Sequence, residues 1–220
     1  MRNKTFHSLL YFLAFWLFVG LSFILTNINT LDSSMHTKLF EAMPHSGVTH
    51  EVTAVLLNFR ALDTLLEVGV ILLSLIAIHA LEPNFRYTPL SFENTITNTF
   101  VAILFPLIAL YAFYILYSGS YQSGGAFSAS ALLAGGIIIL RLVKPRSFFV
   151  PKELILRFLY VSGLFYFVCV GMISLFFGSF LEYRDYIASF YIISIESVLM
   201  LSLGAILSAY FINAVQRVKP

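Results

Sequence analysis

Three ionisable residues follow one another at helical spacing at the start of a long apolar stretch. Arg60, Asp63 and Glu67 fall on one stripe of an α-helix, and Ser74 falls on the same stripe. A helix N-terminus explains an acid at position 63, because the helix dipole favours negative charge there. Glu67 lies about 10 Å further along, and a carboxylate at that depth needs a partner, a proton or water. Both acids are therefore candidates for an ion or proton path, with Arg60 tuning their charge, and a simple helix cap is the alternative.

Two further titratable residues stand within apolar stretches. Glu196 lies roughly 13 Å from the point, near residue 187, where its stretch begins. A buried carboxyl group can hold and exchange a proton near neutrality, and such residues mark proton relays in membrane helices. The alternative is a permanently protonated Glu196 that makes an interhelical hydrogen bond. His79 could pass protons to the aqueous side, or it could simply lie at the membrane interface.

The composition shows what kind of element must position these residues. Hydrophobic residues make up 59% of the 220 residues and charged residues 11%. Soluble domains hold roughly 45–50% and 25%, so a soluble globule of this size could not bury so many apolar side chains. Cys169 is the only cysteine, which excludes a disulfide scaffold, and a net charge of +2 gives no argument for nucleic acid. The sequence therefore predicts a polytopic membrane protein.

Apolar stretches of about 20 residues can each cross a hydrocarbon core of about 30 Å. Six such stretches are present, at 6–28, 60–81, 95–118, 127–143, 157–181 and 187–213. The first is predicted to be an uncleaved helix, because it ends in polar residues without a small-residue cleavage pattern. With the N-terminus inside, ten of the thirteen lysines and arginines lie on the inner side. We therefore expect an all-α protein with six transmembrane helices, both termini cytoplasmic, in a bacterial or archaeal inner membrane.

The longest loop, 29–59, is predicted to be a polar outer loop. Its three histidines, His36, His45 and His50, are not spaced to share a helical face, so a solvated loop is favoured over a metal site. Its second half, 48–59, is apolar enough to lie along the membrane surface or dip into it.

Two backbone features stand out in the middle of the chain. Pro106 is expected to interrupt the helix at 95–118, because it removes the hydrogen bond to the carbonyl of Ala102. A short glycine-rich turn separates this helix from the next, with glycines at Gly119, Gly124 and Gly125.

No enzyme motif is found. The sequence has no phosphate-binding loop, no cluster of metal ligands and no nucleophile with a base beside it. We therefore expect the chain to carry no catalytic site, cofactor or metal of its own.

The run from Asn58 to Val70, N-F-R-A-L-D-T-L-L-E-V-G-V, resembles a family motif. It is similar to the run N-[FY]-R-A-x-D-T-L-G-E-x-x-V of the small E subunit of membrane-bound hydrogenases. The same run occurs in the C-terminal region of the large A subunit of Mrp-type sodium/proton antiporters. The clear departure is Leu66, where the family usually has glycine. Through this motif the resemblance carries the family's charged run onto Arg60, Asp63 and Glu67.

The stretch from about 93 to 214 resembles the MnhB (MrpB-type) subunit of the same antiporters. The family marker G-H-x-x-P-G-G-G-F corresponds to the turn from Gly119 to Phe127, with Ser120 in place of histidine and Ser123 in place of proline. Together the two resemblances imply an E-like two-helix region at 1–92, an MnhB-like four-helix domain at 93–214 and a cytoplasmic tail at 215–220. They also place Glu196 where MnhB-type subunits often carry an acid.

The resemblance implies an accessory subunit of a multisubunit Na⁺/proton antiporter or of a complex-I-like ion-pumping assembly. Its partners would be the lipid bilayer and other membrane subunits, including large antiporter-like ones, and the transported ions would be Na⁺, H⁺ or both. The alternative is a structural subunit of a redox-driven, hydrogenase-like complex with no direct role in transport.

Overall fold

The structure is a computed structural model that describes residues 12, 15, 16, 18–20, 22, 23, 37, 40–81, 95–143, 153–176, 178–183 and 185–217. The chain divides into two units, Met1–Ala42 and Met43–Pro220. The described positions of the first unit are helical, and its large apolar side chains, such as Phe12 and Trp16, are exposed. All the elements discussed below belong to the second unit.

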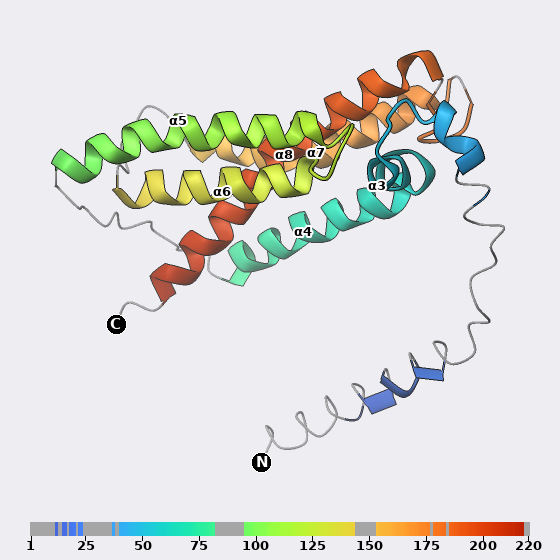
Figure 1. The fold of residues 1–220 in the computed structure, drawn as a ribbon. Helices are drawn as coiled ribbons and strands as arrows, with labels where there is room; N and C mark the ends of the chain where they lie inside the picture. Colours follow the sequence, from blue (N-terminus) through green and yellow to red (C-terminus); the bar gives the residue numbers. More distant parts are fainter. Residues whose placement is uncertain are drawn as a thin grey trace. The chain divides into compact units, whose positions relative to one another are not determined.

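The second unit is a bundle of long helices preceded by short helical turns (Figure 1). The short elements are η1 (Met43–His45), α3 (Glu51–Ala54) and the π-helical turn η2 (Val55–Phe59). The long helices are α4 (Ala61–Leu81), α5 (Thr95–Ser118), α6 (Ala126–Val143), α7 (Glu153–Ser174) and α8 (Asp185–Arg217). The described residues contain no strand, so the all-α prediction is confirmed.

Five of the six predicted spans are confirmed as helices that are long and apolar enough to cross a membrane. The chain is therefore a multi-pass membrane protein. The remaining span, 6–28, lies outside the described residues apart from a few scattered positions. The cytoplasmic location of the termini stays a prediction.

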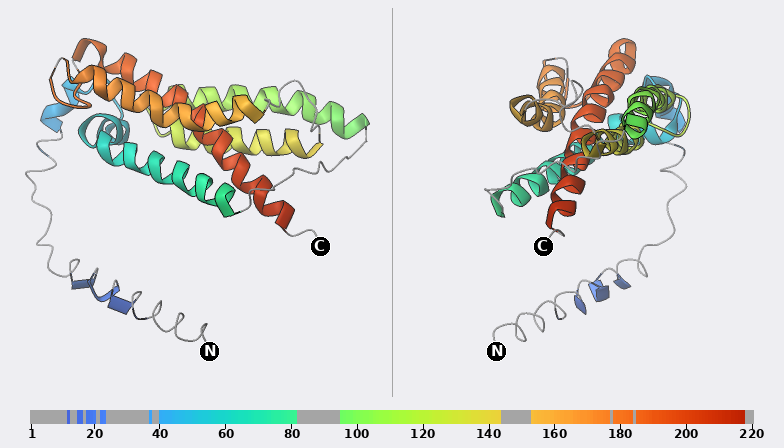
Figure 2. Two further views of the ribbon diagram at one scale, coloured as in Figure 1. Left: turned by 180° about the vertical axis from the view of Figure 1, so that it is seen from behind. Right: turned by 90° about the vertical axis from the view of Figure 1, so that its left-hand side faces the viewer.

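Helix α8 is the central helix of the bundle. It packs against α6 and α7, and it also contacts α4 and α5. The two views of Figure 2 show α8 running through the bundle with the other long helices around it. Several of its side chains are almost completely buried: Ile192, Ile195, Leu199, Met200, Leu203 and Ile206. A helix that buries this much of its surface can hold an ionisable residue away from lipid.

Small residues let the helices approach closely. A methyl group on Gly163 of α7 would lie 2.7 Å from the Cβ of Ser202 on α8, and the Ser202 hydroxyl donates to the carbonyl of Tyr160 (3.0 Å). On the other side of α8, Gly204 lies against Leu133 and the backbone of α6. Close backbone approach and interhelical hydrogen bonds are what hold helices together in lipid, where apolar burial gives little driving force.

Helix α7 begins and ends earlier than the predicted span 157–181. It ends at Ser174, whose hydroxyl donates to the carbonyls of Gly171 (2.8 Å) and Ser179 (3.1 Å) and accepts from the N–H of Leu181 (2.7 Å). This one side chain closes a turn, and Leu181 takes a positive φ of 62° within it. The apolar run continues past the helix end, which is why hydropathy alone misplaced the boundary.

The same turn carries a carboxylate at the aqueous edge of the bundle. Glu182 accepts a hydrogen bond from the N–H of Ser179 (3.0 Å). Hydrogen bonds from the hydroxyl and then from the N–H of Ser179 lower the pKa of Glu182 below its ordinary value of 4.5. The ionised carboxylate therefore stabilises this turn more than the protonated carboxyl group does.

Candidate functional site

The glycine-rich turn between α5 and α6 folds back tightly on the end of α5. The N–H groups of Gly119 and Gly125 both donate to the carbonyl of Ile115 (3.1 Å each). A methyl group on Gly124 would lie 2.5 Å from that same oxygen, and one on Gly119 would collide with the backbone of Gly125. Gly125 has a φ of +92°, a backbone conformation that side chains other than glycine rarely adopt. The turn therefore depends on its glycines.

Glu196 points into this turn from α8. Its side chain is 4% exposed, and its Oε1 accepts a hydrogen bond from the N–H of Ala126 (3.4 Å), the first residue of α6. A methyl group on Gly125 would lie 2.8 Å from the same oxygen. The structure thus brings together two features, the glycine turn and the buried acid, that are about 70 residues apart in the sequence.

The two carboxylate oxygens of Glu196 have different surroundings. Oε2 is buried and has no hydrogen-bond partner among the described residues, and the buried hydroxyl of Ser120 in the adjoining turn also has none. The positive end of the α6 dipole and the Ala126 N–H both stabilise a negative charge on Oε1. Burial of Oε2 without a partner opposes that charge unless a proton or a cation is bound. The helix N-terminus and the unpartnered oxygen therefore act in opposite directions on a negative charge at Glu196.

The segment 49–53 covers the other side of the turn. The N–H groups of Thr49 and His50 donate to the carbonyl of Ser120 (3.1 and 3.2 Å), and the Thr53 hydroxyl donates to the carbonyl of Gly119 (2.5 Å). Sequence reasoning expected this region to lie along the membrane surface or dip into it. The segment forms α3 and η2 and satisfies carbonyls of a turn that lies about 70 residues later in the chain, and its position relative to the membrane stays a prediction. Only the threonines in an apolar segment could have signalled this contact.

The predicted charged stripe on α4 is exposed. Arg60 and Asp63 form an ion pair, with side chains 68% and 49% exposed. Glu67, one turn further on, is exposed and has no hydrogen bond or ion pair among the described residues. Leu66 beside it is 66% exposed, so this face of α4 presents an acid within an apolar surface.

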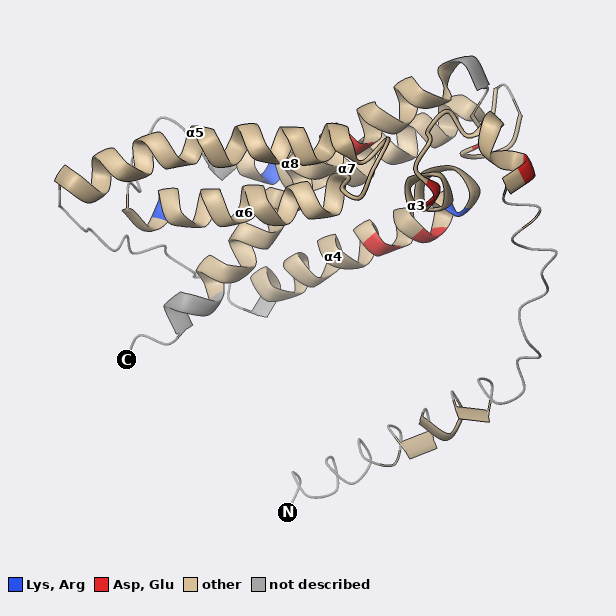
Figure 3. Cartoon of the chain, viewed as in Figure 1, with Lys and Arg blue, Asp and Glu red and all other residues tan. Residues whose placement is uncertain are grey.

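The described contacts do not join the two groups of acids. No hydrogen bond or ion pair between described residues connects Glu196 with Asp63 or Glu67. Figure 3 shows that the acidic positions of α3, α4 and α8 nevertheless lie toward the same end of the bundle. The candidate acids therefore fall into two groups, with Glu196 buried within the chain and Asp63 and Glu67 on the surface of α4.

The remaining predicted residues lie elsewhere. His79 is near the C-terminal end of α4, where its Nδ1–H donates to the carbonyl of Leu75 (2.9 Å), and it is separate from the Glu196 turn. Pro106 lies inside α5, which continues through it from Thr95 to Ser118. The predicted interruption therefore does not end the helix, as is common for proline in membrane helices.

Fold and site together define a multi-pass, all-α membrane protein with a buried carboxyl group held at a glycine turn between helices. The family described as "Domain related to MnhB subunit of Na+/H+ antiporter" matches residues 96–212, which is more than half of the chain and includes both the turn and Glu196. The chain belongs to this family. No curated protein matches it.

Two solved structures contain chains with a similar fold. One is a chain of the Mrp complex from Dietzia sp. DQ12-45-1b, with a TM-score of 0.65 and 25% identity over 97% of this chain and 26% of that one. Our chain thus spans about a quarter of the Dietzia chain. The other is a chain of the membrane-bound sulfane sulfur reductase, an archaeal respiratory membrane complex, with a TM-score of 0.70 and 23% identity over 97% of this chain and 98% of that one.

Proposed function

We propose that this chain is an integral-membrane subunit of a multisubunit cation/proton antiporter, or of a related complex-I-like ion-pumping assembly, in a bacterial or archaeal inner membrane. Its MnhB family membership and its similarity to chains of two multisubunit membrane complexes support this role. In this proposal the chain carries no catalytic site, and it contributes carboxyl groups to a path for Na⁺, protons or both.

The observation that carries the proposal is the environment of Glu196. Burying a carboxyl group inside a membrane protein costs free energy unless the group is neutralised or hydrogen-bonded. A functional role is the usual reason for its presence. Here one oxygen faces a helix N-terminus and the other has no partner among the described residues. Such a group can exchange a proton without rearranging a larger network.

Asp63 and Glu67 are proposed as a second part of the path, at a surface where another subunit would complete it. Both acids are exposed on α4 among apolar side chains. An ionised side chain exposed to lipid costs about 2.5–3.5 kcal/mol at the centre of a membrane helix on insertion scales, and Glu67 lies closer to that depth than Asp63 does. A neighbouring subunit with polar groups or water would remove this cost, and Arg60 would modulate the charge of Asp63 through their ion pair. His79, at the other end of α4, would pass protons toward the aqueous side.

The test uses glutamine variants in the assembled complex. Glu196→Gln and Glu67→Gln should each abolish ion exchange, because glutamine preserves size and hydrogen bonding but cannot bind or release a proton. Exchange is measured as Na⁺-dependent change of the pH gradient in inverted membrane vesicles, with assembly checked by affinity purification. The matched control is Glu51→Gln in α3, an exposed acid outside the spanning helices, which should leave exchange unchanged. Normal exchange by an assembled Glu196→Gln complex would overturn the role of this carboxyl group.

The second candidate is a structural subunit of a redox-driven complex. The specific observation in its favour is that the match to the sulfane sulfur reductase complex covers almost all of both chains. Under this alternative Glu196 is a permanently protonated hydrogen-bond donor, so Glu196→Gln should have little effect on the complex. Mass spectrometry of the subunits that copurify with the tagged chain separates the two, since only the redox complex should contain iron–sulfur or nickel subunits.

A further inference from the structure

A groove separates α4 and α7 at the end of the bundle where α4 ends and α7 begins. Its volume is about 500 Å³. Most of its lining is apolar, from two neighbouring stretches of the two helices: Leu72, Leu75, Ile76, Ala80, Leu156 and Val161. Leu72 and Leu75 are buried in the bundle, whereas Ile76 and Val161 are about half exposed. The groove is therefore an apolar channel that opens toward the lipid side of the two helices.

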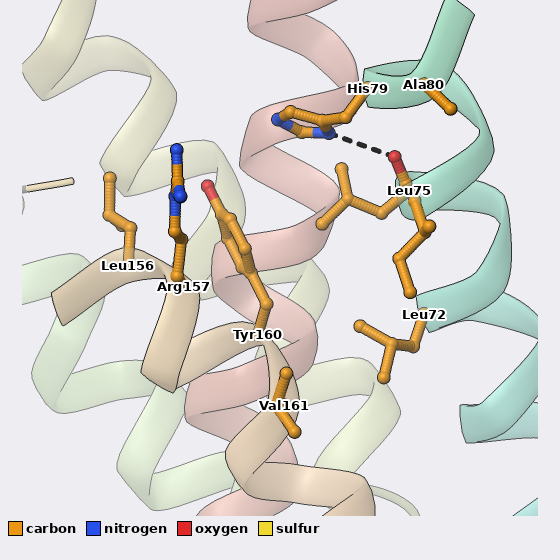
Figure 4. Close-up of a pocket in the computed structure, with 9 residues that line it drawn as sticks. Leu72, Leu75, His79, Ala80, Leu156, Arg157, Tyr160 and Val161 are labelled. Atoms are coloured by element: carbon orange, nitrogen blue, oxygen red, sulfur yellow. Dashed lines mark hydrogen bonds between the residues drawn. The ribbon is translucent and has the colours of Figure 1, made fainter. Parts of the chain in front are cut away.

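The polar residues of the groove are gathered at one end. Arg157 and Tyr160 lie one turn apart on α7, and His79 lies across from them on α4. Figure 4 shows the polar ends of Arg157 and Tyr160 pointing toward the end of the groove that holds His79, with Leu72 and Val161 at the other end. The Nδ1 atom of His79 is used within its own helix, which leaves Nε2 as the ring atom for an external partner.

The polar end lies at the level expected for lipid headgroups. The α4 span ends at Ala80 and the α7 span begins at Leu154, one to three residues from His79 and Arg157. Because α7 starts here, its positive N-terminal dipole end also faces this level. An arginine, an imidazole, a phenol and a helix N-terminus together match a phosphate group.

The size of the groove favours an acyl chain over a helix from another subunit. A helix about 10 Å in diameter occupies 500 Å³ in roughly one turn, so a neighbouring helix would fit only at a single point of contact. An acyl chain is much narrower and can follow the apolar lining along α4 and α7. Basic pockets between helices at a membrane face are typical sites for anionic lipids.

We propose that the groove between α4 and α7 binds one anionic phospholipid, with its phosphate at Arg157, Tyr160 and His79 and an acyl chain along Leu72, Ile76 and Val161. This lipid would fill the gap between α4 and the helices α7 and α8, which meet α4 through few contacts. The site shares His79 with the path proposed above but lies away from the Glu196 turn, and its test measures lipid binding rather than ion exchange, so either proposal can fail without the other.

The test is photolabelling of the purified complex with phosphatidylglycerol that carries a diazirine on its acyl chain. Adducts should map by mass spectrometry to the α4 and α7 peptides that line the groove. Arg157→Gln should lower their yield about fivefold, the factor expected for one arginine near a membrane surface. Arg141→Gln, on α6, is the matched control and should leave the yield unchanged. Val161→Trp, which fills the groove without removing charge, should also abolish the adducts.

Three outcomes would overturn the proposal. Equal labelling by phosphatidylcholine with the same acyl chain would remove the preference for an anionic headgroup. Loss of labelling when inorganic phosphate is added would assign the polar end to a soluble anion. A photoreactive amino acid at position 161 that joins the chain to another subunit, with no lipid adduct, would show that protein covers the groove.

Discussion

Replacing Gly125 by alanine should destabilise the protein through the turn that holds Glu196. Gly125 has a φ of +92°, and forcing another residue into such a conformation costs about 1–3 kcal/mol. The new methyl group would also lie 2.8 Å from Oε1 of Glu196, so the carboxyl group must shift away from the α6 N-terminus. In a chain of this size a loss of 1 kcal/mol lowers the melting temperature by about 2–4 °C, so Gly125→Ala should lower it by roughly 2–12 °C.

The measurement is thermal unfolding in mild detergent, followed through modification of Cys169, the only cysteine, which is half-buried in α7. Gly135→Ala is the control, because a methyl group there has no atom within 4 Å and alanine favours the helix by about 0.5–1 kcal/mol. The double variant Gly125→Ala/Glu196→Ala separates the backbone strain at position 125 from the steric contact with Glu196. It removes the steric contact and leaves the backbone strain. Equal melting temperatures for Gly125→Ala and Gly135→Ala would refute the described geometry of the turn.

Three other changes test the contacts around the site and the bundle. Thr53→Val removes a hydroxyl that donates to the carbonyl of Gly119 and should lower the free energy of unfolding by about 1–3 kcal/mol in the same assay. An unchanged melting temperature would place the segment 49–53 away from the turn. Gly163→Ala adds a methyl group 2.7 Å from the Cβ of Ser202 and should lower the free energy of unfolding by about 1–3 kcal/mol, because it separates α7 from α8. No loss of stability would argue against the close approach of these two helices. The pKa of Glu182 is lowered by hydrogen bonds, so its contribution to stability is present above pH 4.5 and is lost as the pH falls through the lowered value. Acidification through this range should lower the hydrogen-exchange protection of the peptide 178–183, after correction for the intrinsic exchange rate, and Glu182→Gln should remove this pH dependence. The same pH dependence in Glu182→Gln would assign it to another group.

Much of the fold follows from the sequence because lipid imposes a simple constraint. Every backbone polar group in the bilayer must be satisfied within the chain, so long apolar runs become helices. The predicted 95–118 coincides with α5, and 60–81 differs from α4 by one residue. The prediction failed at the end of α7, where the hydroxyl of Ser174 closes a turn inside a run that is still apolar. Side-chain capping of this kind leaves no trace in hydropathy.

The components of the site were recognisable from the sequence, but their arrangement was not. An acid inside an apolar run and a glycine cluster between two such runs both stand out on inspection. That Glu196 faces Gly125 depends on how α8 is rotated and how deeply it lies against α6, which is decided by packing of small residues such as Gly204. The contribution of Thr53 depends on a contact between segments far apart in the chain, and a threonine in an apolar segment is its only local signal.

The two carboxylate groups differ in what each needs in order to function. Glu196 is surrounded by residues of this chain alone. The first residue of α6 donates a hydrogen bond to it, Gly125 leaves room for its carboxyl group, and its burial on α8 keeps it away from lipid. Glu67 has no such surroundings, because its described neighbours on the α4 surface, such as Leu66, are exposed and apolar. A carboxylate in that position is stable in a bilayer only if it is protonated or if another molecule covers it. This contrast is the physical reason for proposing a subunit of a larger assembly rather than a transporter that works alone, since half of the proposed ion path is complete only when another subunit is present.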